Sequence, residues 1–373
     1  AGSSGAVVAF KDYAGTFDTN NVTLVQNGSD KIGGSAVNAT LDTEGIAVTL
    51  VFIDSTQGWL VTDSGLQDEA PTARYIAATG GTITTVCTNF KVHTFTGPGT
   101  FCVSNGGNAA GSNTVDYLVV AGGGAGGTTN GGNGAGGGGG GAGGYRESPG
   151  AASGCYPVSP LGTSPAAALP VSVQGYTVVV GAGGAAITPS CKGNCGSVST
   201  FSSITSAGGG GGGGENAPAK PGNNGGSGGG GQGNPSNISG GTGNTPPTNP
   251  SQGNNGGNGV TNYAGGGGGG AGGVGGTGPN PAGAGGAGAT SSINGTPTAR
   301  AGGGGGGNQP PAGNGPGPAT AGGGDGGVYT IQVGQDATAN TGGGGGGNAF
   351  VPSGPSNTSG AGGSGIVIIR YKF

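Results

Sequence analysis

Few side chains in this 373-residue chain could take part in catalysis. After residue 148 the sequence holds three acidic residues, Glu215, Asp325 and Asp336, and no histidine. Catalysis needs titratable groups that converge on one place, so this part of the chain cannot easily build an active site. The single histidine, His93, lies in the alternating segment Lys91-Val-His-Thr-Phe95, which predicts a surface position on a strand. We therefore expect no enzymatic activity and no cofactor.

Acidic residues are concentrated near the start of the chain. Residues 1–70 hold nine acids against two bases, whereas the remainder holds five acids against eight bases. Asp63, Asp68 and Glu69 could ligate calcium, but they lack the ordered spacing of a calcium loop, so a solvated acidic surface is the favoured interpretation. The change in charge balance predicts a domain boundary near residue 70.

Five cysteines are the remaining reactive groups, and their odd number leaves at least one of them unpaired. A bridge between Cys87 and Cys102 would close a loop of about 15 residues and contribute roughly 3 kcal/mol in the chain-entropy model. Cys191 and Cys195 could pair with each other or with Cys155. Zinc is the alternative, but zinc signatures use two cysteine pairs at tighter spacing, and the sequence offers one histidine. We therefore treat the cysteines as disulfide candidates and expect no metal.

Glycine dominates the rest of the sequence. It supplies 105 residues, while hydrophobic types make up 31% and aromatic types 5%, too little for an ordinary core throughout. Glycine has no side chain to bury, so folding must rely on backbone hydrogen bonds and close backbone packing. Low-complexity disorder is the alternative, but charged residues are only 6% and apolar segments interrupt the glycine. Runs of six or more glycines occupy 136–141, 208–214, 265–270, 302–307 and 342–347.

Alternating apolar segments predict a small all-β domain over residues 1–70. Asp, Asn and Gly turns separate the segments. Phe52 and Trp59 are expected to fill the core, because aromatic residues supply most of the burial that a small domain can achieve. The predicted strands are Ala6–Lys11, Val22–Gln26, Ile46–Asp54 and Gly58–Thr62.

Residues 71–373 are predicted to form a glycine-rich domain in which a β scaffold clamps packed glycine segments. Extended glycine can adopt the polyproline-II conformation, with three residues per turn and backbone groups that point sideways and need lateral partners. The predicted fold class is thus all-β with a polyglycine-II helix bundle. The scaffold is expected at 75–121, 171–206, 328–334 and 365–373. The polyglycine-II segments are expected at 122–144, 207–214, 264–276, 301–307 and 342–347.

Four segments of different composition separate the glycine runs and are expected to connect helices at the bundle ends. Loops on a rigid frame are common recognition sites, because tip sequences can change while the frame stays fixed. Aromatic, basic and amide residues beside the glycine tracts are candidates for receptor contacts, or else they plug the bundle ends. The connecting segments are Glu215–Asn262, Thr277–Arg300, Asn308–Thr320 and Phe350–Gly360. The candidate contact residues are Tyr145, Arg146, Asn216, Tyr263, Asn308, Gln309 and Phe350.

Several strand-to-glycine phrases resemble the glycine-rich domains of bacteriophage tail fibres and receptor-binding adhesins. These phrases are His93-Thr-Phe-Thr-Gly-Pro-Gly-Thr-Phe101, Val115-Asp-Tyr-Leu-Val-Val-Ala-Gly-Gly-Gly124 and Gly365-Ile-Val-Ile-Ile-Arg-Tyr-Lys372. The segment from Val7 to Phe17, with Val48–Asp54 and Gly58-Trp59, is similar to a small β module in structural proteins of marine phages. The resemblance implies a polyglycine-II sandwich whose distal loops contact a protein or glycan on the host surface.

Two functions fit this interpretation. The first is a phage tail-fibre tip, an adhesin of the extracellular virion that binds a host receptor and other fibre proteins, with a homotrimer favoured. The second is a subunit of a self-assembling extracellular filament or surface layer. No stretch of 18 apolar residues occurs and the net charge is −4, so neither a bilayer nor nucleic acid is an expected partner. The chain has no methionine, so a signal peptide or a longer shaft could precede Ala1.

Overall fold

The computed structural model consists of strands and irregular segments, and the residues that it describes include no helix. The chain divides into two compact units, Ala1–Ala73 and Arg74–Phe373, each with its own hydrophobic core. The all-β class is therefore as predicted from the sequence. The described residues are 2–66, 73–129, 135–154, 156–188, 191–215, 220–233, 236–260, 263–278, 281–309, 315–350 and 357–373.

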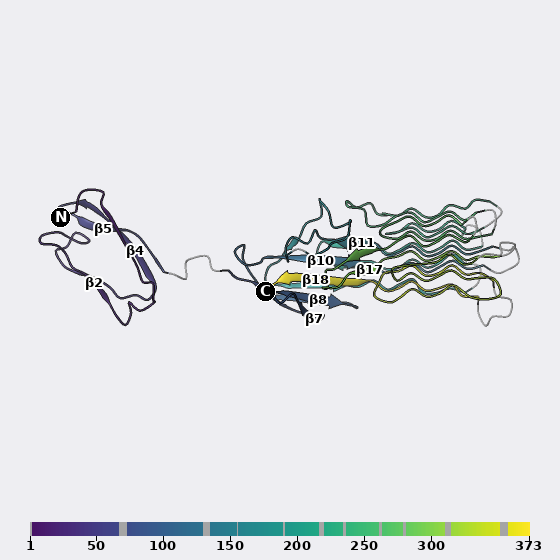
Figure 1. Cartoon of the computed structure of the whole chain (residues 1–373), viewed down its shortest axis with the longest axis horizontal. Helices are drawn as coiled ribbons and strands as arrows, with labels where there is room; N and C mark the ends of the chain where they lie inside the picture. Colours follow the sequence, from purple (N-terminus) through teal and green to yellow (C-terminus); the bar gives the residue numbers. More distant parts are fainter. Residues whose placement is uncertain are drawn as a thin grey trace. The chain divides into compact units, whose positions relative to one another are not determined.

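The N-terminal unit contains two small antiparallel sheets, of which Figure 1 labels strands β2, β4 and β5. Strands β1 (Val7–Lys11), β4 (Ile46–Asp54) and β5 (Gly58–Leu66) form one sheet in the order β1-β4-β5. The other sheet pairs β2 (Val22–Leu24) with β3 (Ala39–Leu41). All four strands that the sequence predicts in this unit are present, and β3 is additional.

The core of this unit follows from alternation along β4. Val48, Leu50 and Phe52 are buried, because side chains two residues apart lie on one face of a strand. The rings of Phe52 and Trp59 pack edge to face at 5.5 Å between centroids. Phe52 thus occupies the predicted core position, whereas Trp59 is only half-buried.

The C-terminal unit is built on a sheet with the strand order β11-β10-β18-β8-β7, and β12 also pairs with β10. The C-terminal strand lies between β10 and β8, with Asp116 opposite Arg370 and Val92 opposite Arg370 on its other side. The two ends of the glycine-rich region therefore pair, as expected from the apolar strands that flank it. The strands are β7 (Thr82–Val86), β8 (Phe90–Phe95), β10 (Thr114–Val120), β11 (Tyr145–Glu147), β12 (Leu169–Pro170) and β18 (Ile366–Lys372).

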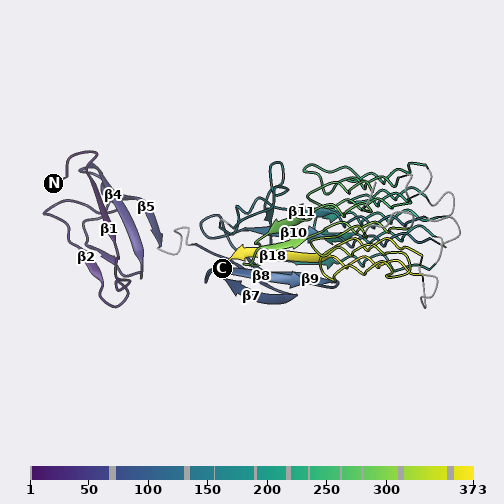
Figure 2. The same ribbon diagram turned by 45° about the vertical axis from the view of Figure 1, so that its right-hand side comes forward.

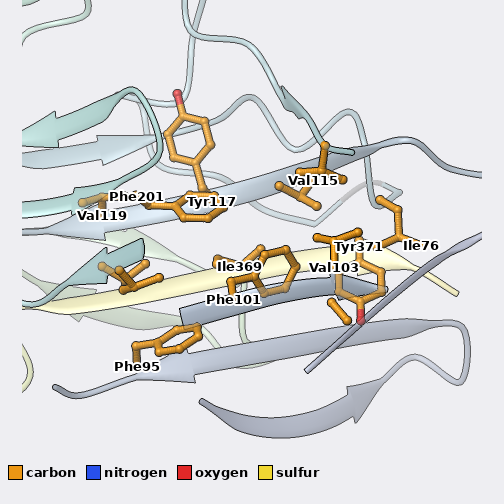
Figure 3. Close-up of a cluster of buried hydrophobic side chains, with 14 of the residues drawn as sticks. Ile76, Phe95, Phe101, Val103, Val115, Tyr117, Val119, Phe201, Ile369 and Tyr371 are labelled. Carbon is orange, nitrogen blue, oxygen red and sulfur yellow. The ribbon is translucent and has the colours of Figure 1, made fainter. Parts of the chain in front are cut away.

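A second sheet, in the order β15-β14-β13-β9-β6, packs against the first and encloses the main core. Figure 3 shows this core, in which Phe101 lies beside Ile369. Phe101 is fully buried, and its ring contacts those of Phe201 and Tyr371. The strands are β6 (Ile76–Thr79), β9 (Gly99–Gly106), β13 (Gly175–Val179), β14 (Ser199–Phe201) and β15 (Ile204–Ser206).

The opposite face of the first sheet is also covered, so β10 and β18 are buried on both sides. The side chains of Leu118 and Ile368 on this face pack with Tyr145, Tyr156 and Ile293. Two-sided burial explains why both strands are nearly continuous apolar runs rather than alternating ones. The hairpin of β16 (Ala289–Ser291) and β17 (Thr298–Arg300) completes the strands of the unit.

His93 is buried rather than exposed, so the predicted surface position is wrong. Its side chain is inaccessible to solvent, because β8 lies in a sheet that the second sheet covers. Its Nδ1 lies 2.7 Å from the carbonyl oxygen of Gly80, and its Nε2 lies 3.1 Å from the hydroxyl of Tyr371. Burial lowers the pKa of His93 and raises the pKa of Tyr371 to about 12. A neutral imidazole that donates to Gly80 and accepts from Tyr371 satisfies both groups.

Beyond the sheets, glycine-rich segments run side by side and bond to one another laterally (Figures 1 and 2). The amides of Gly139, Gly140 and Gly141 donate to three different neighbouring segments. Backbone amides three residues apart donate to the same neighbouring segment. Gly138, Gly141 and Gly144 donate to the carbonyl oxygens of Gly213, Gly210 and Ala207 at 2.9, 2.8 and 2.7 Å. We call this array of hydrogen-bonded segments the glycine lattice.

The glycine lattice is larger than predicted and its segments are shorter. Residues 122–129 and 135–144 form two antiparallel segments, since Gly124 donates to Gly141 and Gly127 donates to Gly138. The segment predicted at 264–276 likewise turns back on itself, because Gly270 donates to Gly273 and Gly267 to Gly276. Parts of Glu215–Asn262, expected to be a connection, also belong to the lattice. Gly228 and Gly231 in this region donate to Asn254 and Gly257.

The strand expected at 328–334 is absent, and a turn occupies its place. The amide of Val328 donates to the carbonyl of Gln332, and the amide of Gln332 donates back to Val328. Thr330 has a φ of 61°, in the left-handed region that a β-branched residue rarely adopts. The apolar alternation of this segment therefore does not correspond to a strand.

Most lattice glycines leave no room for a side chain. A Cβ built at Gly139, Gly140 or Gly268 would overlap a backbone carbonyl of a neighbouring segment. Carbonyl groups belong to hydrogen-bonded backbone, so they cannot give way as a flexible side chain would. The lattice therefore requires glycine for close approach at these positions.

Candidate functional site

The glycine lattice has one end beside the sheets and another end remote from them (Figures 1 and 2). Asn308 forms backbone bridges with Ala264 on one side and Val328 on the other. Three chain segments that are far apart in sequence therefore meet at Asn308. We call this region the distal end.

An aromatic pair lies at the distal end. The rings of Tyr329 and Phe350 have centroids 6.4 Å apart, and both side chains are half-buried. The amide of Tyr329 donates to the carbonyl of Asn308 at 3.1 Å, and that of Thr330 donates to Phe350 at 3.3 Å. Ile331, in the turn that contains Tyr329, is 77% exposed. These contacts hold an apolar and aromatic surface on hydrogen-bonded backbone.

Amide side chains follow directly after three lattice runs. Asn308 comes after Gly302–Gly307, Asn348 after Gly342–Gly347, and Gln232 after Gly228–Gly231. All three are almost completely buried. The side-chain amides of Gln232 and Asn348 have no hydrogen-bond partner. Glycine thus gives way to buried amides where the lattice ends.

The structure brings together four of the predicted contact residues. Tyr263, Asn308, Gln309 and Phe350 all lie at the distal end. Tyr263 and Phe350 are half-buried, so part of each ring is accessible. Asn308 and Gln309 are 2% and 3% exposed, and Gln309 Oε1 accepts the amide of Phe350 at 3.4 Å. They support the surface rather than form it, and Asn216 lies outside the described residues.

Tyr145 and Arg146 do not belong to this group. Both lie in β11, within the first sheet, and Tyr145 is 1% exposed. The Tyr145 hydroxyl donates to Glu147 Oε2 at 3.0 Å. Its side chain is a core residue and cannot contact a receptor from this position. Arg146 is half-buried beside it.

A buried polar cluster surrounds Glu147, and no pattern in the sequence predicts it. Besides Tyr145, the Glu147 carboxylate accepts the amide of Ser159 at 2.9 Å and the hydroxyl of Ser291. Burial raises the pKa of Glu147 despite these donors, and burial also lowers the pKa of nearby Arg300. The cluster ties β11 to β16 and to the chain around Ser159, which is a structural role.

A second buried carboxylate, Asp116 of β10, is satisfied in the same way. It accepts the hydroxyl of Ser148 at 2.8 Å and the amide of Ser153 at 2.8 Å. Arg370, opposite Asp116 in β18, lies over the ring of Tyr156 at 4.8 Å. These interactions anchor the chain that follows β11 to the sheet.

The cysteines that the structure describes are unpaired. Cys87, Cys102, Cys191 and Cys195 are free and exposed, so neither the Cys87–Cys102 bridge nor the Cys191–Cys195 bridge is formed. Cys155 lies outside the described residues. Within the described ranges, no three His, Cys, Asp or Glu side chains are grouped so that they could hold a metal ion. The same ranges contain no helix long and apolar enough to cross a membrane.

Comparison with known proteins assigns the chain at the family level. The profile of a family described as a glycine-rich domain matches residues 94–372, which is most of the chain. A search of curated proteins finds no match. The matched region begins in β8 and ends in β18, so it contains the sheets as well as the glycine lattice. The chain belongs to the glycine-rich domain family.

Proposed function

We propose that the lattice segments are polyglycine-II helices. A polyglycine-II helix has three residues per turn, so successive amides point in three directions about 120° apart. The three-residue period of hydrogen bonding, and the three different neighbours of Gly139, Gly140 and Gly141, support this proposal. Asn255 and Asn258, also three residues apart, are exposed between less exposed neighbours. A segment at the edge of the lattice can thus carry side chains on one side.

The proposed function is that of a phage tail-fibre tip, an adhesin that recognises a receptor on the host surface. The observation that carries it is the arrangement at the distal end, where Tyr329, Phe350 and the exposed Ile331 lie on a hydrogen-bonded backbone frame. Tyrosine and other aromatic residues are favoured anchors in interfaces, and a fixed frame reduces the entropy lost on binding. The receptor would be a protein or a glycan.

This proposed function implies a location, partners and an oligomeric state for the protein. The chain would act outside the cell, on the virion, with other fibre proteins as partners and a homotrimer as the favoured assembly. It would not be an enzyme, because the titratable groups described above are satisfied in structural clusters or isolated on the surface. It would need no cofactor, nucleic acid or membrane insertion.

Cell binding tests the proposal directly. The purified chain, labelled with a fluorophore, is incubated with a panel of bacterial strains, and binding is compared with that of the double variant Tyr329→Ala/Ile331→Ser. We expect saturable binding to some strains, reduced about tenfold or more in the variant, since interface anchors contribute about 2 kcal/mol or more. Val173→Ser is the control, because Val173 is 66% exposed but lies between β12 and β13. Equal binding by all three proteins would refute the assignment of the distal end.

The filament alternative is tested by electron microscopy of the same protein. A filament subunit should polymerise through exposed strand edges, and β7 is such an edge, with Ile83 44% exposed. A fibre tip should remain as closed, discrete particles. Regular polymers of the purified chain would favour the filament function over the adhesin.

A further inference from the structure

The N-terminal unit contains a pocket that its small core leaves unfilled. The pocket has a volume of about 500 Å³ and lies between the two sheets. Val8 and Phe10 of β1 and Leu50 of β4 line one side, and Leu24 of β2 lines the other. The pocket is partly open to solvent, because the lining residues Thr23, Val25 and Asn27 are exposed. A space of this size falls in the range of small-molecule sites, about 300–1,000 Å³.

The two walls of the pocket differ in chemistry. Phe10, Leu50 and Trp59 provide apolar and aromatic surface. The opposite segment, from Thr23 to Asp30, contributes several polar side chains, among them Gln26 and Asp30. A ligand that fits both walls must have an apolar face and an edge of hydrogen-bonding groups.

The side-chain oxygen of Gln26 has no hydrogen-bond donor, and such a ligand could supply one. Its backbone amide donates to Asn38 Oδ1 at 3.2 Å, but its side-chain Oε1 is buried without a hydrogen bond. A buried acceptor without a donor costs about 1–3 kcal/mol. A ligand hydroxyl in the pocket would remove this cost.

Trp59 is held in place before any ligand binds. Its ring packs against Phe52, and a Cβ at Gly2 would lie 2.9 Å from the Trp59 ring and 2.7 Å from that of Phe52. Glycine at position 2 therefore lets the chain pass over both rings. A fixed aromatic surface loses little conformational entropy when a ligand stacks on it.

We propose that the N-terminal unit binds a neutral mono- or disaccharide in this pocket. The C–H face of a pyranose would stack on the aromatic wall, and its hydroxyls would bond to Gln26 and Asp30. An acyl chain would leave the polar wall unpaired, which is unfavourable. An anionic sugar would be repelled, because residues 1–70 hold nine acids against two bases. This site is separate from the distal end and does not depend on the proposed receptor binding.

The fluorescence of the intact chain gives a direct test, because Trp59 is its single tryptophan. Glucose, galactose, N-acetylglucosamine and their disaccharides are titrated, with glucuronic acid and dodecanoic acid as contrasting probes. We expect a saturable change with at least one neutral sugar. Affinity should fall about three- to tenfold in Gln26→Ala, which loses one hydrogen bond. Gln57→Ala is the matched control, because Gln57 is exposed and does not line the pocket.

Several results would overturn the proposal. These are no saturable change with any neutral sugar, a response to dodecanoic acid or glucuronic acid alone, and equal affinity in Gln26→Ala. Saturation-transfer NMR on the unmodified chain adds a measurement that does not depend on any variant folding. Ring C–H protons of the sugar must receive saturation from the protein, and their failure to do so would also exclude the site.

Discussion

Replacing Gly140 with alanine would test whether close backbone approach stabilises the glycine lattice. A Cβ at Gly140 would overlap the carbonyl of Gly124, so one of the two segments must move. The Gly124 carbonyl accepts the amide of Gly345 at 2.9 Å, and the Gly140 amide donates back to Gly345 at 2.8 Å. Moving either segment breaks one of these bonds and also the bond from the Gly124 amide to the Gly141 carbonyl at 2.8 Å, so at least two buried hydrogen bonds are lost.

The expected loss can be estimated from these two bonds. Each leaves buried backbone groups unpaired at about 1–3 kcal/mol, giving roughly 2–6 kcal/mol. Alanine restricts the unfolded chain and returns about 0.4–1 kcal/mol, so the net loss is about 2–5 kcal/mol. The unit Arg74–Phe373 has roughly 300 residues, for which the unfolding entropy is about 0.6 kcal/mol/K. The melting temperature should fall by about 3–8 °C.

Differential scanning calorimetry measures this change, and Gly315→Ala is the control. Gly315 belongs to the same unit, but no atom lies within 4 Å of a Cβ built there. Its substitution should leave the melting temperature unchanged or raise it slightly. Amide exchange at Gly139–Gly141 should accelerate only in the Gly140 variant. If Gly140→Ala and Gly315→Ala have the same melting temperature, close packing of glycine backbones does not stabilise this unit.

Three further outcomes follow from buried or exposed side chains. Burial lowers the folded-state pKa of His93, so the stability that the neutral side chain contributes should be complete above about pH 6.5 and lost as the pH falls through the lower folded-state pKa. In His93→Gln, the melting temperature should therefore depend less on pH between about pH 7 and 5. A pH profile of the melting temperature that is unchanged by the substitution would contradict this. Glu147→Ala should destabilise the C-terminal unit by about 2–5 kcal/mol in urea unfolding, since it leaves the donors of Tyr145, Ser159 and Ser291 unpaired. Glu147→Gln keeps an acceptor oxygen and should destabilise the unit less. Equal destabilisation by the two variants would show that the acceptor oxygen of residue 147 is unimportant. Cys87, Cys102, Cys191 and Cys195 should all react with a thiol reagent in the native protein, and protection of a pair without reductant would show a bridge.

The strands that sequence patterns predict best are those with the simplest environments. In β4, alternating burial matches the alternating sequence, and its bounds Ile46–Asp54 are as predicted. Strands β10 and β18 are continuous apolar runs beside glycine, and such runs fit a sheet buried on both faces. His93 was misplaced because its strand alternates like a surface strand, while the packing of a distant sheet decides its exposure. The sequence of the five residues Lys91–Phe95 contains no information on that packing.

The lattice shows a different limit. Pure glycine runs reveal its interior, where side chains would overlap carbonyl groups on neighbouring segments. Segments at its edge, such as the one that contains Asn255 and Asn258, carry exposed side chains three residues apart and look like ordinary polar loops. A search for residues with a three-residue period would find them, whereas a search for glycine runs does not. The strand predicted at 328–334 is wrong because a two-residue alternation of apolar side chains also occurs in a turn.

The separation between interior and edge bears on how the proposed adhesin could change its receptor specificity. Inside the lattice, almost any substitution of glycine displaces backbone, so the frame tolerates little variation. At the distal end, Tyr263, Tyr329 and Phe350 are half-buried, and Ile331 projects from a turn. Their replacement would alter the surface without disturbing the hydrogen bonds that the backbone of Asn308 makes beneath it. Under the proposed adhesin function, a frame held by main-chain contacts would separate stability from recognition, because the residues proposed for binding are those that the lattice does not use.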